Sequence, residues 1–295
     1  MILPMGDAEL EMGSAYLGEL RDSTAALHDF DACRQRMADD GYLLLRGFHD
    51  ADTVRTARRG LLENLAANGQ IDTAYPLDHA VIAGQSGGQF LGGAKAVSHT
   101  PEFLAVVEGA APMEWFANFL DGPSLTFDYK WIRAVGHGAH TGAHFDVVYM
   151  GRGTRRLYTV WTPLGDVAYE QGPLAVVGGS TQLDRVRQTY GEMDVDRDHV
   201  EGWFSKHPAE LVERYNCRWL TSEFAVGDVM IFGMYLMHGS LNNTTNRFRL
   251  SCDTRYQRAD EPVDERWVGE NPKAHYGWHA APLVPMEEMR AKWGV

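Results

Sequence analysis

The chain has 295 residues, 44% of them hydrophobic, which is enough to fill the core of one large domain. Its formal net charge of −13 opposes binding to polyanions, which argues against nucleic acid and anionic membrane surfaces as partners. Cys33, Cys217 and Cys252 are scattered and form no CxxC pair, which argues against a disulfide framework and for a reducing compartment.

The sequence shows no sign of secretion or membrane insertion. Its N-terminus lacks the basic region and the apolar run of a signal peptide. The longest apolar runs, such as residues 230–237, fall far short of the about 20 residues that span a bilayer. We therefore expect a cytoplasmic protein. The sequence leaves open whether it is a monomer or a homo-oligomer.

The first third of the chain is expected to be mainly helical. Residues 1–24 show little periodicity and predict an irregular lead-in. Apolar residues recur at helical spacing over residues 27–37, which predicts the first helix. Residues 41–47, an apolar run between two glycines, predict a short buried strand.

Two further helices are expected before residue 124. The first covers residues 53–67, with Asp50 or Asp52 as its N-cap and Asn68-Gly69 at its end. The second starts at Thr100-Pro101, with the proline in the first turn, and continues to about residue 120.

A glycine-rich segment, residues 84–93, lies between these two helices. It superficially resembles a phosphate-binding loop, but the sequence continues as Ala94-Lys95-Ala96 and lacks the Lys-Ser or Lys-Thr of such loops. We therefore reject nucleotide binding there and interpret the segment as a candidate active-site lid.

From residue 124 onward the pattern changes to strands. The segments are short, rich in aromatic or β-branched residues, and bounded by Gly, Pro or Asn. They cover residues 125–135, 144–150, 157–163, 173–177, 219–224, 228–232 and 248–256. Many strands without intervening helices predict a β-sandwich or barrel.

These patterns predict a mainly β fold with a helical N-terminal part, organised as a single domain over residues 1–295. Residues 1–123 form the helical part, which packs on a β core formed by residues 124–258. A charged, partly helical insert over residues 184–215 interrupts the core, and residues 259–295 form a C-terminal extension.

Candidate metal ligands lie in the triplet His144-Phe145-Asp146. In a strand, side chains at i and i+2 point to the same face, so His144 and Asp146 can bind one ion together. A buried strand after Gly227-Asp228 delivers His238 at its far end. Two histidines and one carboxylate on one face of a metal leave three positions open, which is typical of non-haem Fe(II) oxygenases.

A candidate anion-binding residue follows eleven positions after His238. Arg249 lies on the predicted strand 248–256, where a fixed guanidinium can hold a carboxylate bidentately. Arg247 lies on the same strand face and competes for this role, but the spacing from His238 favours Arg249. His137 and His140 do not fit the ligand spacing and are interpreted as loop or pocket-rim residues.

The order and spacing of several motifs resemble the phytanoyl-CoA dioxygenase family. The motifs are His144-x-Asp146, Trp161-Thr-Pro-Leu-Gly-Asp166, Gly172-Pro-Leu-Ala-Val-Val-Gly-Gly-Ser180, Gly227-Asp228, His238-Gly-Ser240 and Arg249. The resemblance covers about residues 125–257. It implies a double-stranded β-helix, a jelly roll of the cupin-like barrel type, and an oxygenase that uses Fe(II), 2-oxoglutarate and O2.

The resemblance also implies roles for individual residues. His144, Asp146 and His238 would bind iron, and Arg249 would pair with the distal carboxylate of 2-oxoglutarate. Ser240 and Trp161 would line the cosubstrate pocket. Strand alternation adds Thr159 to the face of Trp161, so its hydroxyl is a further candidate contact for 2-oxoglutarate.

Four residues are candidates for contact with the substrate. Phe145, between the two ligands, points outward and could shape the mouth of the pocket. Tyr149 is interpreted as core or pocket lining. Arg152, in a basic cluster with Arg155 and Arg156, could receive a carboxylate or phosphate of the substrate, and Arg133 is placed similarly.

The expected reaction is the oxidation, most simply the hydroxylation, of a C–H bond of a small molecule, with release of succinate and CO2. The same iron site supports desaturation, epimerisation, cyclisation or demethylation, so these outcomes stay open. Two alternatives also remain: a cupin-type metal enzyme that does not use 2-oxoglutarate, and a non-catalytic binding protein on the same fold. The presence of Asp146 counts against a halogenase, in which a small residue replaces this carboxylate.

Overall fold

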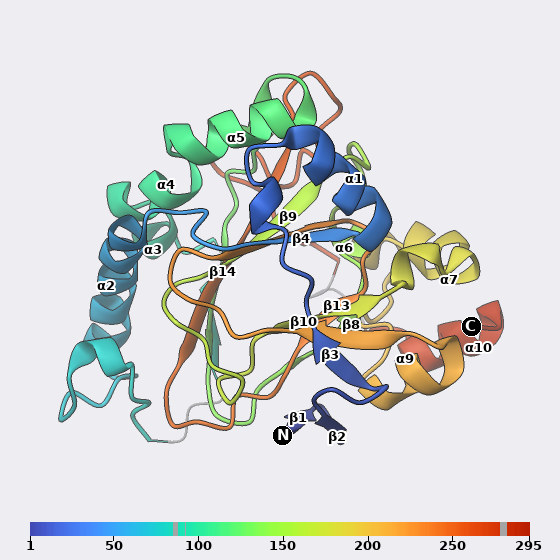
Figure 1. The fold of residues 1–295 in the computed structure, drawn as a ribbon, viewed down its shortest axis with the longest axis horizontal. Helices are drawn as coiled ribbons and strands as arrows, with labels where there is room; N and C mark the ends of the chain where they lie inside the picture. Colours follow the sequence, from blue (N-terminus) through green and yellow to red (C-terminus); the bar gives the residue numbers. More distant parts are fainter. Residues whose placement is uncertain (85–87, 92, 278–281) are drawn as a thin grey trace.

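The computed structural model describes residues 1–84, 88–91, 93–277 and 282–295, and its centre consists of two β-sheets that face each other (Figure 1). The larger sheet has the strand order β4 (Tyr42–Leu45), β12 (Val229–Gly233), β9 (Tyr158–Pro163), β14 (Arg249–Arg258), β7 (Trp131–Val135) and β5 (Gly88–Phe90). A short strand, β6 (Ser124–Thr126), also pairs with β14. The smaller sheet has the order β3 (Leu17–Glu19), β11 (Arg218–Thr221), β10 (Leu174–Gly178), β13 (His238–Ser240) and β8 (Thr141–His144). The two sheets form the predicted double-stranded β-helix.

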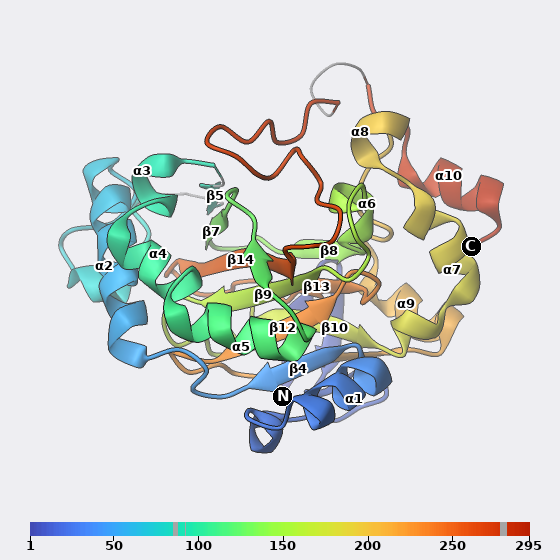
Figure 2. The same ribbon diagram turned by 90° about the horizontal axis from the view of Figure 1, so that it is seen from above.

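Helices cover the outer face of the larger sheet, as Figure 2 shows from above. Helices α2 (Ala51–Ala67) and α4 (Pro101–Val107) pack on the outward side chains of β7 and β14, such as Ile132, Leu250 and Cys252. Helices α1 (Phe30–Asp40) and α5 (Ala110–Leu120) pack on the outward faces of β4, β9 and β12. A short helix, α3 (Lys95–Ser98), leads into α4.

This covering fixes which side chains of β14 point inward. Because alternate residues of a strand face opposite sides, the contact of Leu250 and Cys252 with the helices turns Arg249, Asp253 and Arg255 toward the space between the sheets. The same alternation on β7 turns Trp131 and Arg133 inward. The inner face of the larger sheet therefore carries several charged side chains.

The insert and the C-terminal segment lie together beside the smaller sheet. The insert carries α7 (Asp184–Gln188), α8 (Val195–Asp198) and α9 (Pro208–Tyr215), and the C-terminal segment ends in α10 (Met286–Trp293). Arg290 on α10 forms an ion pair with Glu210 on α9. In the part of the chain that the structure describes, no helix has the length and apolar character needed to cross a bilayer.

Several predicted elements need correction. Residues 1–24 are not an irregular lead-in: β1 (Ile2–Met5) and β2 (Ala8–Glu11) form a hairpin, and β3 pairs in parallel with β11. Sequence patterns could not reveal this pairing, because β11 lies about 200 residues further along the chain. The predicted helix 101–120 is two helices, α4 and α5, with Gly109 as the N-cap of α5.

The strand expected over residues 144–150 is also wrong beyond its first residue. β8 ends at His144, and Val147–Met150 forms the short helix α6, with Asp146 as its N-cap in a helical conformation. The β-branched and aromatic residues of this run favour a strand locally, but tertiary packing overrides that preference. The predicted strand 125–135 is interrupted between β6 and β7, and His238 starts the separate strand β13 after β12 has ended at Gly233.

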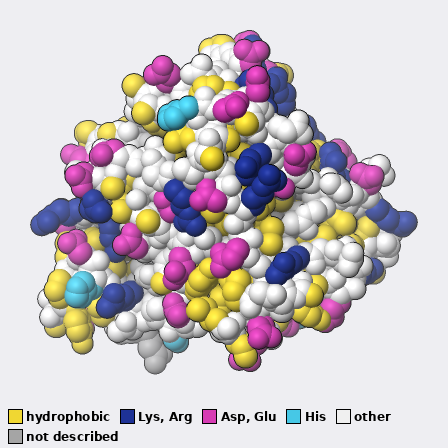
Figure 3. All heavy atoms as spheres, viewed as in Figure 1, with side chains coloured by type: hydrophobic (Ala, Val, Ile, Leu, Met, Phe, Trp, Pro, Cys, Tyr) yellow, Lys and Arg dark blue, Asp and Glu magenta, His cyan; other side chains and the backbone are white. Residues whose placement is uncertain are grey.

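One face of the molecule shows how the charged side chains are distributed on it. On the face that Figure 3 displays, the described basic and acidic side chains are intermixed, and the basic ones do not gather into a continuous patch. A continuous positive surface is what non-specific binding to a nucleic-acid backbone requires.

Candidate metal centre and its cavity

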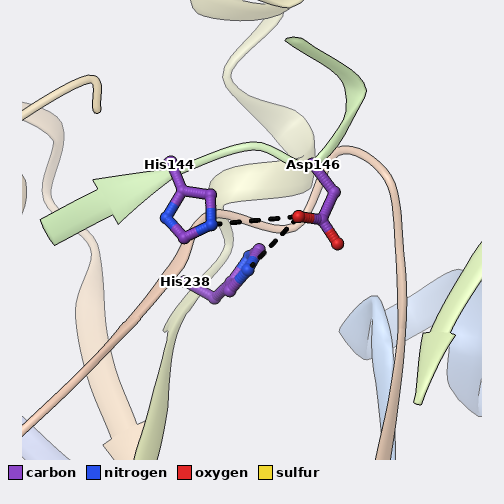
Figure 4. A group of neighbouring side chains, drawn as sticks. All are labelled: His144, Asp146 and His238. Carbon is purple, nitrogen blue, oxygen red and sulfur yellow. Dashed lines mark ion pairs between the residues drawn. The ribbon is translucent and has the colours of Figure 1, made fainter. Parts of the chain in front are cut away.

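Three side chains converge at the edge of the smaller sheet (Figure 4). His144 ends β8 and His238 starts β13, and the two residues are direct partners in the antiparallel pair. The Nε2 atoms of His144 and His238 lie 3.8 Å and 3.7 Å from Oδ1 of Asp146. One ligand atom from each of the three residues lies within 4.8 Å of the others. The predicted metal ligands are therefore brought together on one face.

The backbone holds both imidazoles with Nε2 toward the centre. Nδ1 of His144 lies 2.9 Å from the carbonyl oxygen of Gly142, and Nδ1 of His238 lies 3.0 Å from that of Leu236. A carbonyl oxygen only accepts hydrogen bonds, so Nδ1 carries the proton in both rings and Nε2 keeps its lone pair. Such contacts behind a ligand orient the ring and fix its tautomer.

Both histidines favour the neutral form that a metal requires. Burial, with a smaller effect of the neighbouring His238 imidazole, lowers the pKa of His144 to about 3. Burial also lowers the pKa of His238. Neutral imidazole is the metal-binding form. The pair can therefore bind a cation at neutral pH without first losing protons.

The carboxylate of Asp146 is held from behind by two donors. Its Oδ2 accepts hydrogen bonds from the Thr159 hydroxyl and from Nη2 of Arg255, the latter at 3.1 Å. Burial alone would raise the pKa of Asp146, but Arg255, the imidazoles and Thr159 outweigh it and hold the pKa below its ordinary value. Oδ1 is left facing the imidazoles. The side chain is therefore ionised and arranged to give one oxygen to a metal.

Sequence reasoning did not identify Arg255. Its guanidinium lies 4.1 Å from the ring centroid of Trp131, and 3% of its side chain is exposed. Strand alternation could have indicated it, since Arg255 shares a face of β14 with Arg249. Thr159 was expected to contact 2-oxoglutarate, but its hydroxyl donates a hydrogen bond to the carboxylate of Asp146.

Arg249 is a buried cation at the start of β14, with 2% of the residue exposed. Its guanidinium lies 5.7 Å from the ring centroid of Trp161. Among the described residues its Nε has no hydrogen-bond partner. Burial, with the nearby charge of Arg133, lowers the pKa of Arg249 to about 10, so the group stays charged at neutral pH. Burying a charge without a partner is costly, so this arrangement fits an anionic ligand.

The third expected cosubstrate residue, Ser240, lies two residues after His238 on β13 and is buried. Its Oγ accepts a hydrogen bond from the backbone NH of Thr141 at 3.0 Å. The donor set therefore fits both groups of the expected cofactor system: two neutral imidazoles and a carboxylate for ferrous iron, and a buried guanidinium for a dicarboxylate.

A cavity of about 520 Å³ opens onto these ligands. His144 and Asp146 form part of its wall. The remaining lining residues are Phe90, Tyr129, Trp131, Arg133, Ala134, Val135, Ala139, His140, Thr141, Tyr149, Met150, Trp203, Arg255, Ala274 and His275. Its volume is in the range of pockets that enclose small organic molecules.

Two of the four predicted substrate residues lie in this wall. Tyr149 places its ring 5.5 Å from that of His144, and Arg133 projects from β7. Arg152 instead forms a two-point ion pair with Asp194, at 2.6 and 3.0 Å, outside the lining of the cavity. Phe145 does not shape the mouth: it is fully buried and packs 5.5 Å from the ring of Tyr190, because α6 begins directly after the triplet.

The competing residues are placed as follows. Arg247 is exposed and lines a separate outer groove, so it does not compete with Arg249. His137 is exposed, and His140 lines the cavity without joining the ligand cluster.

Of the candidate lid, residues 85–87 and 92 lie outside the described residues. Gly88–Phe90 forms β5, which pairs with β7, and Phe90 reaches the cavity.

Comparison with known proteins supplies the family. The family model described as phytanoyl-CoA dioxygenase (PhyH) matches residues 37–251. A 1-deoxypentalenic acid 11-beta-hydroxylase of Streptomyces exfoliatus is 27% identical over 253 residues, covering 82% of this chain and 86% of that protein. The enzyme of the same description from Streptomyces arenae is 25% identical over 248 residues, covering 81% of this chain and 84% of that protein.

Solved structures confirm the fold. The epimerase SnoN in complex with Fe3+, alpha ketoglutarate and nogalamycin RO has a TM-score of 0.58 at 18% identity, covering 88% of this chain and 94% of that chain. The apo form of EctD from S. alaskensis has a TM-score of 0.56 at 19% identity, covering 97% and 95%. Because the family model spans most of the chain and a candidate iron triad is present, the protein belongs to the phytanoyl-CoA dioxygenase family and is an iron- and 2-oxoglutarate-dependent dioxygenase.

Proposed function

We propose that the protein hydroxylates a C–H bond of a small-molecule substrate held in the 520 Å³ cavity. The observation that carries this proposal is the convergence of His144, Asp146 and His238 next to the cavity, of whose wall His144 and Asp146 form part. The relatives named above as hydroxylases support hydroxylation as the outcome.

In this proposal the three convergent side chains hold iron, and Arg249 holds the distal carboxylate of 2-oxoglutarate beside Trp161 and Ser240. Iron(II) with 2-oxoglutarate supplies the activation of O2 that oxidises the substrate, while the cosubstrate is split into succinate and CO2. The ring of Trp161 packs beside the guanidinium of Arg249 and limits its movement. Thr159 and Arg255 hold the second oxygen of Asp146 by hydrogen bonds, so that its first oxygen would be the one to bind the metal.

The aromatic side chains of the cavity wall position the substrate and exclude water. Tyr149, with its ring next to His144, packs against the substrate close to the metal. Water exclusion strengthens the electrostatic contacts within the site and prevents side reactions. The residues that hold the metal therefore lie at one end of a chamber whose other walls select the substrate by shape.

Turnover of 2-oxoglutarate in the absence of a substrate tests this assignment. The Fe(II)-loaded protein should slowly convert 2-oxoglutarate to succinate in the presence of O2. His144→Ala should lose both iron binding and turnover. His137→Ala, which removes an exposed histidine outside the ligand cluster, should keep both. Stoichiometric iron binding without any binding or conversion of 2-oxoglutarate would contradict the proposal.

A further inference from the structure

Arg133 brings a positive charge into the wall of the cavity. It projects from β7 on the same face as Trp131, and a third of its side chain is exposed. Its guanidinium lies 5.2 Å from the ring centroid of Phe90, which is itself half exposed. A ligand that enters the cavity can therefore reach this group.

One edge of the Arg133 guanidinium is available for a ligand. Nε donates to Oδ2 of Asp253 at 3.1 Å. Among the described residues the two terminal nitrogens have no hydrogen-bond partner. Two parallel N–H donors match the two oxygens of a carboxylate. Asp253 thus fixes the orientation of the guanidinium and leaves its outer edge for an anion.

The other two arginines of this interior have different partners. Arg255 is occupied by Asp146 and is almost fully buried. Arg249 lies deeper, beside Trp161, and is assigned to 2-oxoglutarate in the proposed function. Of the described arginines that face the interior, Arg133 is therefore the one that remains for the substrate.

The charges between the sheets favour a ligand with one negative charge. Strands β7 and β14 present Arg133, Arg249, Arg255 and Asp253 to this space, where Asp146 also lies. Ferrous iron and dianionic 2-oxoglutarate cancel each other, so three arginines and two aspartates leave one positive charge. An uncompensated charge in a partly buried site is unfavourable, and a monoanion would neutralise it.

The remainder of the wall is suited to an apolar body. It includes six large apolar or aromatic side chains, Phe90, Tyr129, Trp131, Tyr149, Met150 and Trp203, and four smaller apolar ones, Ala134, Val135, Ala139 and Ala274. Such surfaces bind by area and shape, while a few polar groups set the orientation. A molecule with one charged group and a carbon skeleton complements this cavity.

We propose that the substrate is an apolar small molecule with a single carboxylate, and that Arg133 binds this carboxylate and so orients the skeleton toward the metal. The proposal rests on the proposed function, because it assumes that Arg249 serves 2-oxoglutarate. Asp253 acts as a positioning residue that holds Arg133.

Paired ligands test the charge preference. The probes are monocarboxylic acids with apolar skeletons of about 10 to 20 carbon atoms, each compared with its own primary alcohol. Their affinities are measured by anaerobic calorimetry on protein loaded with Fe(II) and 2-oxoglutarate. At least one acid should bind at least about tenfold more tightly than its alcohol, since a hydrogen-bonded charge pair contributes that much. A panel in which no acid exceeds its alcohol, or in which nothing binds, overturns the proposal.

Variants then test the residue. Arg133→Gln should remove the preference for the acid, with the affinity for the alcohol nearly unchanged, and Arg133→Lys should keep part of it. Arg59→Gln, which removes an exposed arginine on α2, should bind like the wild type. Retention of the full preference in Arg133→Gln overturns the assignment.

The cosubstrate is followed in the same samples through the visible absorption band of iron-bound 2-oxoglutarate. An unchanged midpoint for 2-oxoglutarate in Arg133→Gln supports the proposal, and a large rise shows that Arg133 serves the cosubstrate and overturns it. Absence of the band in the wild type would contradict the proposed function itself, so the two failures are distinguishable. If Arg133→Gln does not fold, the comparison of acids with alcohols on the wild type still decides whether the cavity prefers a carboxylate, and Arg133→Lys then tests the residue.

Discussion

The side chain of Asp146, a candidate metal ligand, is held in place by the residues behind it. One of its oxygens faces two imidazoles, and the other is shared between a hydroxyl and a guanidinium. The residues behind a metal ligand typically change metal affinity by about 10- to 100-fold when they are removed. Arg255 and Thr159 therefore belong to the functional description of the site.

Arg255→Gln should weaken iron binding by about 10- to 100-fold, because the buried carboxylate loses its charged partner and its fixed orientation. Fe(II) titration under anaerobic conditions measures this. Thr159→Val, which removes only a hydroxyl, should weaken iron binding less and leave the affinity for 2-oxoglutarate unchanged. An Arg255→Gln protein that binds iron as tightly as the wild type would contradict this role.

At this scale the sequence predicted that the three candidate ligands would lie together, as they do, and missed the residues that support them. His144, Asp146 and His238 were identifiable because a short motif and its distance to a later histidine are visible in one dimension. Arg255 belongs to no motif. Its role depends on the alternation of β14 and on the pairing of β14 with β9, which brings Arg255 opposite Thr159.

Among the secondary-structure elements, three of the described helices that cover the larger sheet, α1, α2 and α4, start at a residue whose side chain caps them. The side chain of Asp50, one of the two predicted candidates, accepts the hydrogen bond from the backbone NH of Thr53 at the start of α2. Thr100 caps α4 in the same way, by accepting from the NH of Phe103 at 3.2 Å. α4 in turn buries Phe103 and Val107 against the outward face of β14, the face that the helices cover.

Thr100→Ala should lower the free energy of unfolding by about 1 kcal/mol, because an N-terminal NH of α4 loses its acceptor. Thr100→Ser keeps the hydroxyl and should lie within a few tenths of a kcal/mol of the wild type. Urea unfolding followed by circular dichroism measures both. Equal stability of the alanine and serine variants would show that this cap does not contribute.

The elements that the sequence predicted incorrectly share a physical cause. The run Val147–Met150 has strand-forming residues, yet it forms a helix that is buried in the core and follows directly on Asp146. The strands β1, β2 and β3 are short, and β3 is stabilised by a distant partner. Local propensity therefore predicted the long, periodic segments and failed where a distant contact decides.

For the whole molecule, a network of buried charges joins the C-terminal segment to the insert. Arg266 forms ion pairs with Asp196 and with Asp264, the latter at 2.6 Å. Asp194 lies between two arginines and forms ion pairs with both Arg266 and Arg152. This network lies next to the cavity, because Nη2 of Arg266 also donates to the carbonyl oxygen of Tyr149 at 2.8 Å. Sequence patterns could place these segments in order but not reveal that they meet.

The network predicts a specific loss of stability in acid. Burial raises the pKa of Asp194, but hydrogen bonds from Arg152 and from the NH of Arg197, with the charge of Arg266, outweigh this and lower the pKa to about 2. Since the folded-state pKa lies below the ordinary value of 3.8, the ionised carboxylate stabilises the fold above about pH 4. That contribution is lost as the pH falls from about 4 to about 2.

The difference in unfolding free energy between the wild type and Asp194→Asn should therefore shrink over this pH range, as measured by urea unfolding at each pH. Asp31→Asn, at an exposed position, should show no such change. A difference for Asp194→Asn that is independent of pH would contradict the account.

The central claim is that iron and 2-oxoglutarate bind together between His144, Asp146, His238 and Arg249. An anaerobic titration of the Fe(II)-loaded protein with 2-oxoglutarate, followed by visible absorption, tests it most directly. We expect a weak charge-transfer band in the wild type, its loss in His144→Ala, and a much higher 2-oxoglutarate requirement in Arg249→Ala. A protein that binds iron normally but shows no band, or an Arg249→Ala variant with wild-type affinity for 2-oxoglutarate, would contradict it.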